Sequence, residues 1–243
     1  MEKKGAQLFI GALTAGIVAT STITGAATIK GNVETTETVE YVMKENEHNF
    51  TSQEYSLNTL GTPYITITYN KDGKIVQKSI HECDSFDEII KGLPKGFGYK
   101  KFYLKGYKGE VFAITGHPDT SNGKNTSYYA YFFTKQSGSH VRYVGSIKTD
   151  SYDRPIKLSS DGILYASATR DIYETFLVTS DGQKLLYKDH IFLFRHEEEC
   201  EGIRRDSDVS APGKQFQSRD KKDYDKYVKQ LQNTPAISFD IVK

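Results

Sequence analysis

The sequence predicts a mainly β protein, an antiparallel meander that forms a sandwich or an open barrel with two short helices. Short runs rich in Tyr, Phe, Val, Ile and Thr recur from residue 64 onward, and these residues pack well on a pleated sheet. Asp-Gly pairs that suit tight hairpins separate several of the runs. The length of 243 residues fits one ordinary domain with an N-terminal extension.

The first 27 residues have the pattern of a secretory signal peptide. Lys3 and Lys4 precede an uncharged stretch whose centre is apolar, and small residues such as Ala26 and Ala27 follow it. The alternatives are an uncleaved membrane anchor, since about 20 apolar residues span a bilayer, or a buried helix. Because threonines make the second half of the stretch polar, we expect cleavage, no stable membrane span afterwards, and a secreted or envelope-associated protein.

Residues 28–60 are predicted to be an acidic, flexible tether. Glutamates alternate there with Thr, Asn, Ser and Gln, and the few apolar residues are widely spaced. Such a segment buries too little apolar surface to offset the entropy lost on ordering it. The β-rich domain is therefore expected to span residues 61–243.

The first predicted strand, Tyr64–Tyr69, alternates strictly between its two faces, and Asp72-Gly73 supplies the turn that follows. The other predicted strands are Ile75–Ile80, Lys100–Lys105, Glu110–Thr115, Ser127–Thr134, Val141–Lys148, Gly162–Thr169, Ile172–Thr179, Lys184–Tyr187, His190–Phe194 and Ala236–Val242.

Two helices are predicted among the strands. Ser85 and Glu88 have the spacing of a capping box, and Gly92 and Pro94 end the helix that follows. The second helix runs from about residue 220 to 232, with an apolar stripe formed by Tyr224, Tyr227, Val228 and Leu231.

A Ser-Asp-Gly sequence occurs twice, at residues 160–162 and 180–182. This spacing is typical of successive hairpins in a meander. Propeller-like sheet repeats are the alternative fold, but no repeat of the roughly 40 to 50 residues that a propeller blade needs is present.

Cys83 and Cys200 are the only cysteines in the sequence. In an exported chain, an even number of cysteines most simply indicates a disulfide. We therefore expect a bridge between Cys83 and Cys200.

Several functional classes have no support in the sequence. A net charge of +1 argues against nucleic-acid binding, which needs an excess of basic residues. The six histidines form no zinc motif, and no nucleophile elbow or phosphate-binding glycine motif is present, so we expect no metal and no cofactor. A secreted hydrolase that uses scattered acid and His residues remains the alternative function, with His117 and Asp119 as one candidate pair.

The aromatic content suggests a binding function, because the chain has 17 Tyr and 13 Phe but no Trp. Tyr rings offer an apolar face and a polar hydroxyl, which suit them to stack on sugars or to anchor a protein partner. Tyr103, Tyr107, Tyr129 and Tyr131 are the candidate ligand-binding residues. The expected function is non-catalytic binding of a glycan or protein at the cell surface.

Overall fold

The computed structural model describes residues 66–243 except 72–73, 117, 122 and 207. Three antiparallel sheets and two α-helices occur in these residues, and no sheet closes into a barrel. The predicted mainly β fold with two short helices is therefore confirmed. The predicted signal peptide at 1–27, the predicted tether at 28–60 and the start of the first predicted strand lie outside the described residues.

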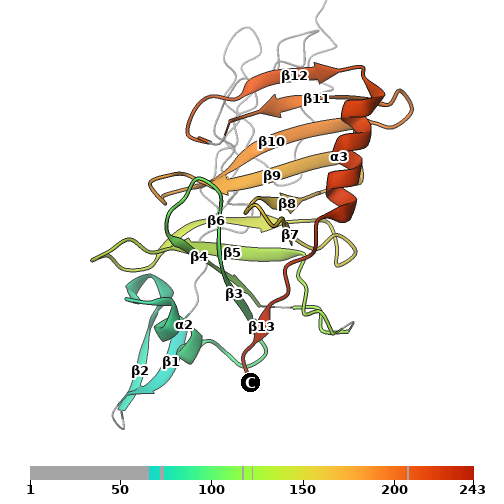
Figure 1. Cartoon of the computed structure of the whole chain (residues 1–243). Coiled ribbons are helices and arrows are strands. Elements are labelled where there is room, and N and C mark those ends of the chain that lie inside the picture. The colour runs from blue at the N-terminus through green and yellow to red at the C-terminus, as the bar shows by residue number, and fades with distance from the viewer. Residues whose placement is uncertain (1–65, 72–73, 117, 122, 207) are drawn as a thin grey trace, which may run out of the picture. The chain divides into compact units, whose positions relative to one another are not determined.

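A five-stranded sheet has the order β13-β3-β4-β5-β6 (Figure 1). Four of its strands follow one another along the chain as a meander, and the short last strand pairs with the first of them. The bounds are β3 Gly98–Tyr103, β4 Glu110–Thr115, β5 Tyr129–Thr134, β6 Arg142–Lys148 and β13 Asp240–Ile241.

A six-stranded sheet has the order β12-β11-β10-β9-β8-β7, which is a second meander. The bounds are β7 Lys157–Leu158, β8 Leu164–Ala166, β9 Ile172–Val178, β10 Leu185–Phe194, β11 Glu199–Arg204 and β12 Lys214–Ser218. Neither sheet is built from a repeated blade, so the propeller alternative is not supported.

A hairpin of β1 (Thr66–Lys71) and β2 (Lys74–Ser79) leads through the short 3-10 helix η1 (Ile80–Glu82) into helix α2 (Phe86–Gly92). The predicted cap of α2 is present, because the Ser85 hydroxyl accepts a hydrogen bond from the Glu88 backbone N–H. The Glu88 carboxylate in turn accepts a hydrogen bond from the backbone N–H of Asp84.

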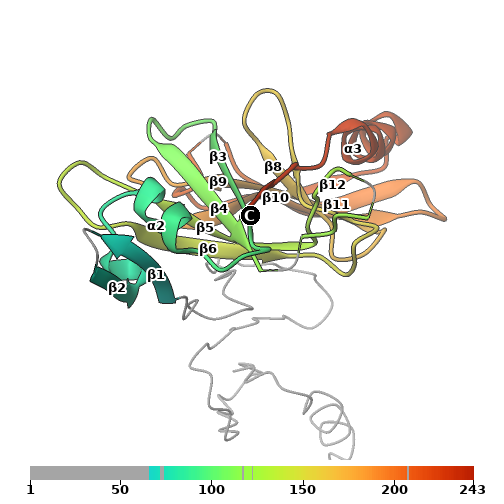
Figure 2. The same cartoon turned by 90° about the horizontal axis from the view of Figure 1, so that it is seen from below.

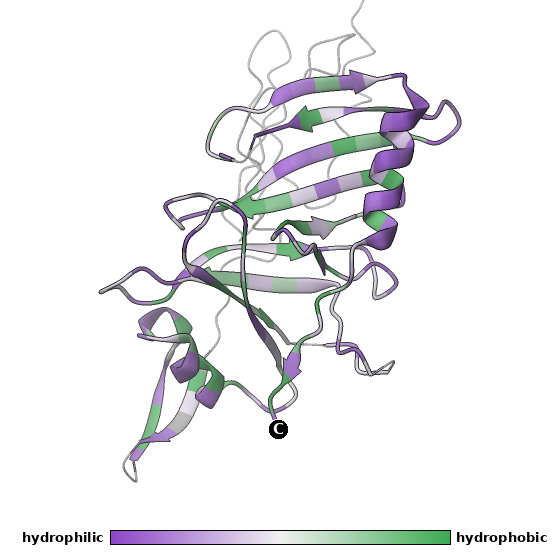
Figure 3. Cartoon of the chain, in the orientation of Figure 1, coloured by the Kyte–Doolittle hydropathy of each residue, from purple (hydrophilic) through white to green (hydrophobic). Residues whose placement is uncertain are grey.

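Two hydrophobic clusters form the interior. The main cluster contains side chains from both large sheets, for example Phe132 of β5 and Phe176 of β9, as expected when two sheets pack in a sandwich. The second cluster lies on the other face of the five-stranded sheet, where Phe112 stacks on Phe86 of α2. Hydrophobic and hydrophilic residues alternate along several strands, which is the pattern expected of strands with differently covered faces (Figure 3).

Helix α3 (Lys221–Asn233) lies across strands of the six-stranded sheet (Figures 1 and 2). Its Asp220 N-cap carboxylate accepts a hydrogen bond from the Lys222 N–H. Tyr227 is buried and its ring centroid lies 4.7 Å from that of Tyr173 in β9. Tyr224 is also buried, so the predicted apolar stripe faces the sheet. None of the described helices is both long and apolar enough to cross a membrane.

The two Ser-Asp-Gly sequences form equivalent turns in the β7–β8 and β9–β10 hairpins. Gly162 and Gly182 have positive φ angles of 79° and 70°. The Gly162 carbonyl accepts a hydrogen bond from the Lys105 N–H, and the Gly182 carbonyl accepts one from the Thr134 hydroxyl. Both turns therefore fasten the six-stranded sheet to the five-stranded sheet.

Three strands were not predicted, namely β7, β11 and β12. Residues 195–198 form the turn between β10 and β11, and Glu199 begins β11. The two strands predicted at 184–187 and 190–194 are one strand, β10, with a register shift between Tyr187 and Asp189.

Candidate functional site

Tyr129 and Tyr131 lie next to each other on the outer face of the five-stranded sheet. Their ring centroids are 6.1 Å apart, and both side chains are half-buried. The intervening residue, Ala130, points to the main cluster. Desolvation raises the pKa of both phenols.

Tyr103 and Tyr107 do not join this pair. Tyr103 ends β3 opposite Glu110 and is 66% exposed, whereas the register places Tyr131 beside Ile114 at the other end of β4. Tyr107 packs against the main cluster and contacts Gly182, and its hydroxyl is hydrogen-bonded to Thr134. The four predicted residues therefore do not form one continuous face.

A different set of tyrosines gathers around Tyr129 and Tyr131. Successive ring contacts join these two to three others, with centroid distances of 4.7 to 6.3 Å. We call this set the tyrosine row; its members are Tyr128, Tyr129, Tyr131, Tyr143 and Tyr152. Sequence reasoning found two of the five, because only Tyr129 and Tyr131 stand out as alternate residues of one strand.

The predicted disulfide between Cys83 and Cys200 is not formed in this structure. Cys83 and Cys200 are both free and fully buried. They belong to different hydrophobic clusters, Cys83 beside α2 and Cys200 in β11. Burial raises the pKa of each thiol to about 11, so both are protonated at neutral pH.

Of the candidate pair for hydrolysis, the structure describes only Asp119. His117 lies outside the described residues, and the Asp119 carboxylate accepts hydrogen bonds from the backbone and hydroxyl of Ser121 within its own loop. His190 pairs with the buried Glu174 at 3.2 Å in the six-stranded sheet. No group of three metal-ligating side chains is present among the residues that the structure describes.

A cavity of about 370 Å³ lies between helix α3 and one end of the six-stranded sheet. Three arginines line it, each from a different connection: Arg154 between β6 and β7, Arg170 between β8 and β9, and Arg195 between β10 and β11. We call this site the arginine cavity. Its volume is at the small end of the range of about 300 to 1,000 Å³ that is usual for ligand pockets.

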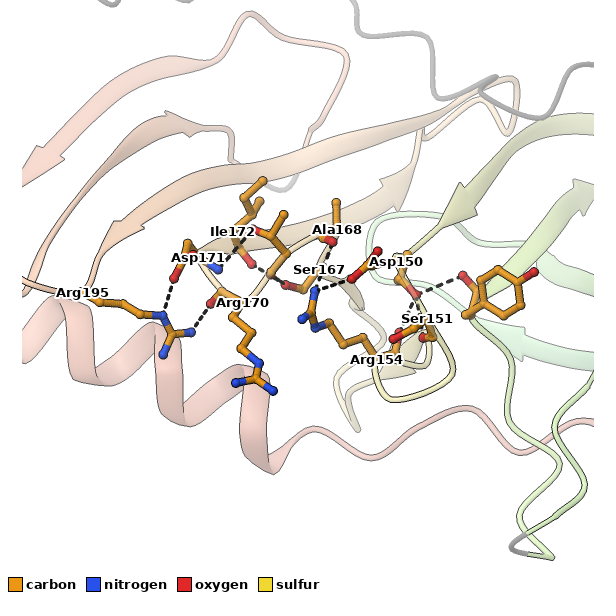
Figure 4. A network of polar contacts seen from close by, with 12 residues as sticks. Asp150, Ser151, Arg154, Ser167, Ala168, Arg170, Asp171, Ile172 and Arg195 are labelled. Atoms are coloured by element: carbon orange, nitrogen blue, oxygen red, sulfur yellow. Dashed lines mark hydrogen bonds and ion pairs between the residues drawn. The ribbon is translucent and has the colours of Figure 1, made fainter.

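Two of the guanidinium groups are held in place by carboxylates and backbone carbonyls (Figure 4). Arg154 donates to the Asp150 carboxylate at 3.1 Å and to the Ala168 carbonyl at 3.2 Å. Arg195 donates to the Asp171 carboxylate and to the Arg170 carbonyl. Each group uses two of its five N–H donors in these contacts, so the cavity is lined by oriented donors.

Lys157 contributes a fourth positive charge to the wall. Its ammonium group donates to the carbonyls of Leu231 and Gln232 in the last turn of α3, which contains no basic residue of its own. A cation at this position stabilises the negative end of the helix dipole. Burial lowers the pKa of Lys157.

The remaining wall is largely apolar. Leu193 of β10 and Val228 and Leu231 of α3 contribute aliphatic groups, and the buried Tyr165 of β8 contributes a ring. The Tyr173 hydroxyl, which is hydrogen-bonded to Tyr165, donates to the Gln230 side chain at 3.0 Å and so connects the sheet to α3 behind this wall. The cavity combines apolar surface with a few oriented charged donors, which is the usual make-up of a small-ligand site.

Sequence reasoning did not find the arginine cavity. Arg154, Arg170 and Arg195 are spread over 41 positions and belong to no motif. Their only local signs are neighbouring acids, Asp150 four residues before Arg154 and Asp171 directly after Arg170. No protein-family model, curated protein or solved structure matches this chain.

Proposed function

We propose that this chain is an extracytoplasmic, non-catalytic binding domain that recognises a glycan through the arginine cavity. The observation that carries this proposal is the cavity itself, with two guanidinium groups held by protein contacts above an apolar wall. Pre-oriented donors favour binding because little conformational entropy is lost when the ligand arrives.

The composition of the lining favours binding over hydrolysis. Asp153 is its only carboxylate, and it contains neither His nor Cys. Glycoside hydrolysis ordinarily needs two carboxyl groups on opposite sides of the scissile bond. A lining with one exposed carboxylate lacks that arrangement.

The size of the cavity favours a sugar unit over a protein surface. A stable protein interface buries roughly 800 Å² on each partner, whereas this cavity has a volume of about 370 Å³, which is the scale of a small-ligand site. The export pattern at 1–27 supports a ligand outside the cytoplasm, where surface glycans are found.

Glycan-array binding by two helix variants tests the proposal. Val228 lines the cavity, so Val228→Phe fills part of it, while Lys229→Phe places the same ring on the exposed neighbouring position. We expect the wild type and Lys229→Phe to bind the same glycans and Val228→Phe to lose them, with all three showing the same circular dichroism spectrum.

Two results would count against the proposal. Equal glycan binding by Val228→Phe and wild type would exclude the cavity as the site. Binding only to surface proteins would show that the glycan assignment is wrong.

A further inference from the structure

We infer that the arginine cavity selects a ligand carrying a single carboxylate on an otherwise neutral body, such as a uronic acid unit of a glycan. This inference rests on the proposed function, since it names the chemical class of ligand for the same cavity.

The charges around the cavity nearly balance. Arg154, Lys157, Arg170 and Arg195 are positive, while the lining Asp153 and the two acids paired with arginines, Asp150 and Asp171, are negative. Four cations and three carboxylates leave one net positive charge. One anionic group on the ligand restores neutrality, and a second would be repelled by the three carboxylates.

Arg170 is the group that supplies the excess charge. No described residue accepts a hydrogen bond from its guanidinium group, although its backbone carbonyl holds Arg195. Figure 4 shows the side chains of Arg170, Arg195 and Arg154 on the side of the strands that faces helix α3. A guanidinium group binds a carboxylate through two parallel N–H bonds, so the two oxygens of one carboxylate match the fork of Arg170.

The helix end disfavours phosphate. Phosphate groups are commonly bound at helix N-termini, where backbone N–H groups and the dipole favour negative charge. The arginine cavity is instead lined by Leu231 and Gln232 in the last turn of α3, the negative end of the helix dipole, and Lys157 only offsets this. A phosphate monoester with a charge of about −1.5 to −2 at neutral pH is therefore a poorer match than a carboxylate.

The apolar part of the lining indicates which groups the ligand carries besides its carboxylate. Leu193, Val228 and Leu231 give the lining an aliphatic part that offers no partner for further charges on the ligand. A ring that carries C–H groups on one face and a carboxylate at its edge satisfies both walls. A hexuronate has this layout.

The test compares hexuronates of the gluco, galacto and manno series with their parent hexoses and the corresponding hexose 6-phosphates. Each is titrated into the 15N-labelled protein while the Nε–Hε signals of the arginines are followed. We expect at least one hexuronate to bind about tenfold or more tightly than its parent hexose and than its 6-phosphate, with shifts in the signals of Arg154, Arg170 and Arg195.

Two charge variants complete the test. Arg170→Gln is expected to weaken hexuronate binding about tenfold more than it weakens hexose binding. Arg142→Gln is the matched control, because Arg142 is exposed on β6 and does not line the cavity.

The inference is overturned if no hexuronate binds, if hexose and hexuronate bind equally, if a phosphate binds most tightly, or if Arg170→Gln has no effect. The proposed function survives those results when array glycans still bind in a way that Val228→Phe abolishes. It fails with the inference when Val228→Phe leaves glycan binding intact.

Discussion

At the residue scale, Gly182 shows how one position joins two sheets. Its φ is +70°, and a Cβ added there would lie 2.7 Å from the ring of Tyr107. Gly138 has nearly the same backbone angle, +77°, but open space around it. We expect Gly138→Ala to cost about 1 kcal/mol from the backbone alone, and Gly182→Ala to cost about 3 kcal/mol because the ring must also move.

Urea unfolding of the two glycine variants measures this difference. The loss of unfolding free energy in Gly138→Ala measures the backbone cost alone. The additional loss in Gly182→Ala therefore measures the effect of the contact with Tyr107. Equal costs would show that this contact does not help to hold the hairpin against the five-stranded sheet.

The two thiols provide a second prediction at this scale. Native protein at neutral pH should resist alkylation at Cys83 and Cys200, because both are buried and their pKa values lie near 11 rather than 9. Unfolded protein should take up two labels per chain, as measured by intact mass. An unreduced chain that takes up no label after unfolding would instead indicate the disulfide.

The same pKa values give the thiols a defined effect on stability. Each thiol keeps its proton to a higher pH in the folded protein than in the unfolded chain. Its contribution to the free energy of unfolding is therefore fully present below about pH 9. That contribution is lost as the pH rises from about 9 to about 11. Cys83→Ala and Cys200→Ala variants should show a weaker loss of stability than wild type across this window.

Individual residues were the hardest features to predict from the sequence. Tyr129 and Tyr131 could be placed on one face because side chains alternate along a strand, and their rings do lie together. Whether Cys83 and Cys200 can form a disulfide depends on the distance between two separate elements of the fold, and this distance cannot be derived from the composition. The even number of cysteines is the only basis that the sequence offers for this pairing.

At the element scale, helix α3 forms one wall of the arginine cavity. Substitution of its N-cap residue tests how much the cap stabilises the helix. Asp220→Ala removes the carboxylate that accepts from the Lys222 N–H at 2.8 Å. We expect a cost of about 1 kcal/mol. Asp225→Ala, which removes only an exposed ion pair with Lys221, should cost about 0.5 kcal/mol or less.

Thermal unfolding followed by far-UV circular dichroism compares the two helix variants. A larger loss of thermal stability in the Asp225 variant than in the Asp220 variant would mean that the exposed ion pair, and not the cap, stabilises the start of the helix.

Apolar alternation predicted most of the strands and missed β7, β11 and β12, of which only β11 contributes a buried residue, Cys200, to the main cluster. β4 was predicted at its observed bounds because five of its six residues are buried. β12 has no buried residue, and β11 carries Glu199, Glu201 and Arg204, so hydropathy alone could not separate them from loops. These strands exist because β10 offers a free edge with which β11 pairs, and β11 then pairs with β12.

At the scale of the whole molecule, the arginine cavity depends on topology. Arg154, Arg170 and Arg195 reach one place because three connections of the meander meet near the last turn of α3. The Leu193 N–H donates to the Asp171 carbonyl at 2.7 Å and so ties the β8–β9 connection to the end of β10. A meander of known strand order predicts that alternate connections share one end of a sheet, but the sequence does not reveal which end the helix covers.

Export is the prediction that concerns the entire chain, since an extracytoplasmic ligand requires an extracytoplasmic domain. The basic start at Lys3 and Lys4, the apolar centre and the small residues before residue 28 predict cleavage by a signal peptidase. N-terminal sequencing of protein recovered from the medium or envelope of a bacterial host should find a chain that begins near residue 28. Leu13→Arg places a charge in the apolar centre and should leave the full-length chain in the cytosol, whereas Thr36→Arg, beyond the cleavage region, should not. Full-length wild-type protein found only in the cytosol would contradict export, and with it the assignment of a surface glycan as the ligand.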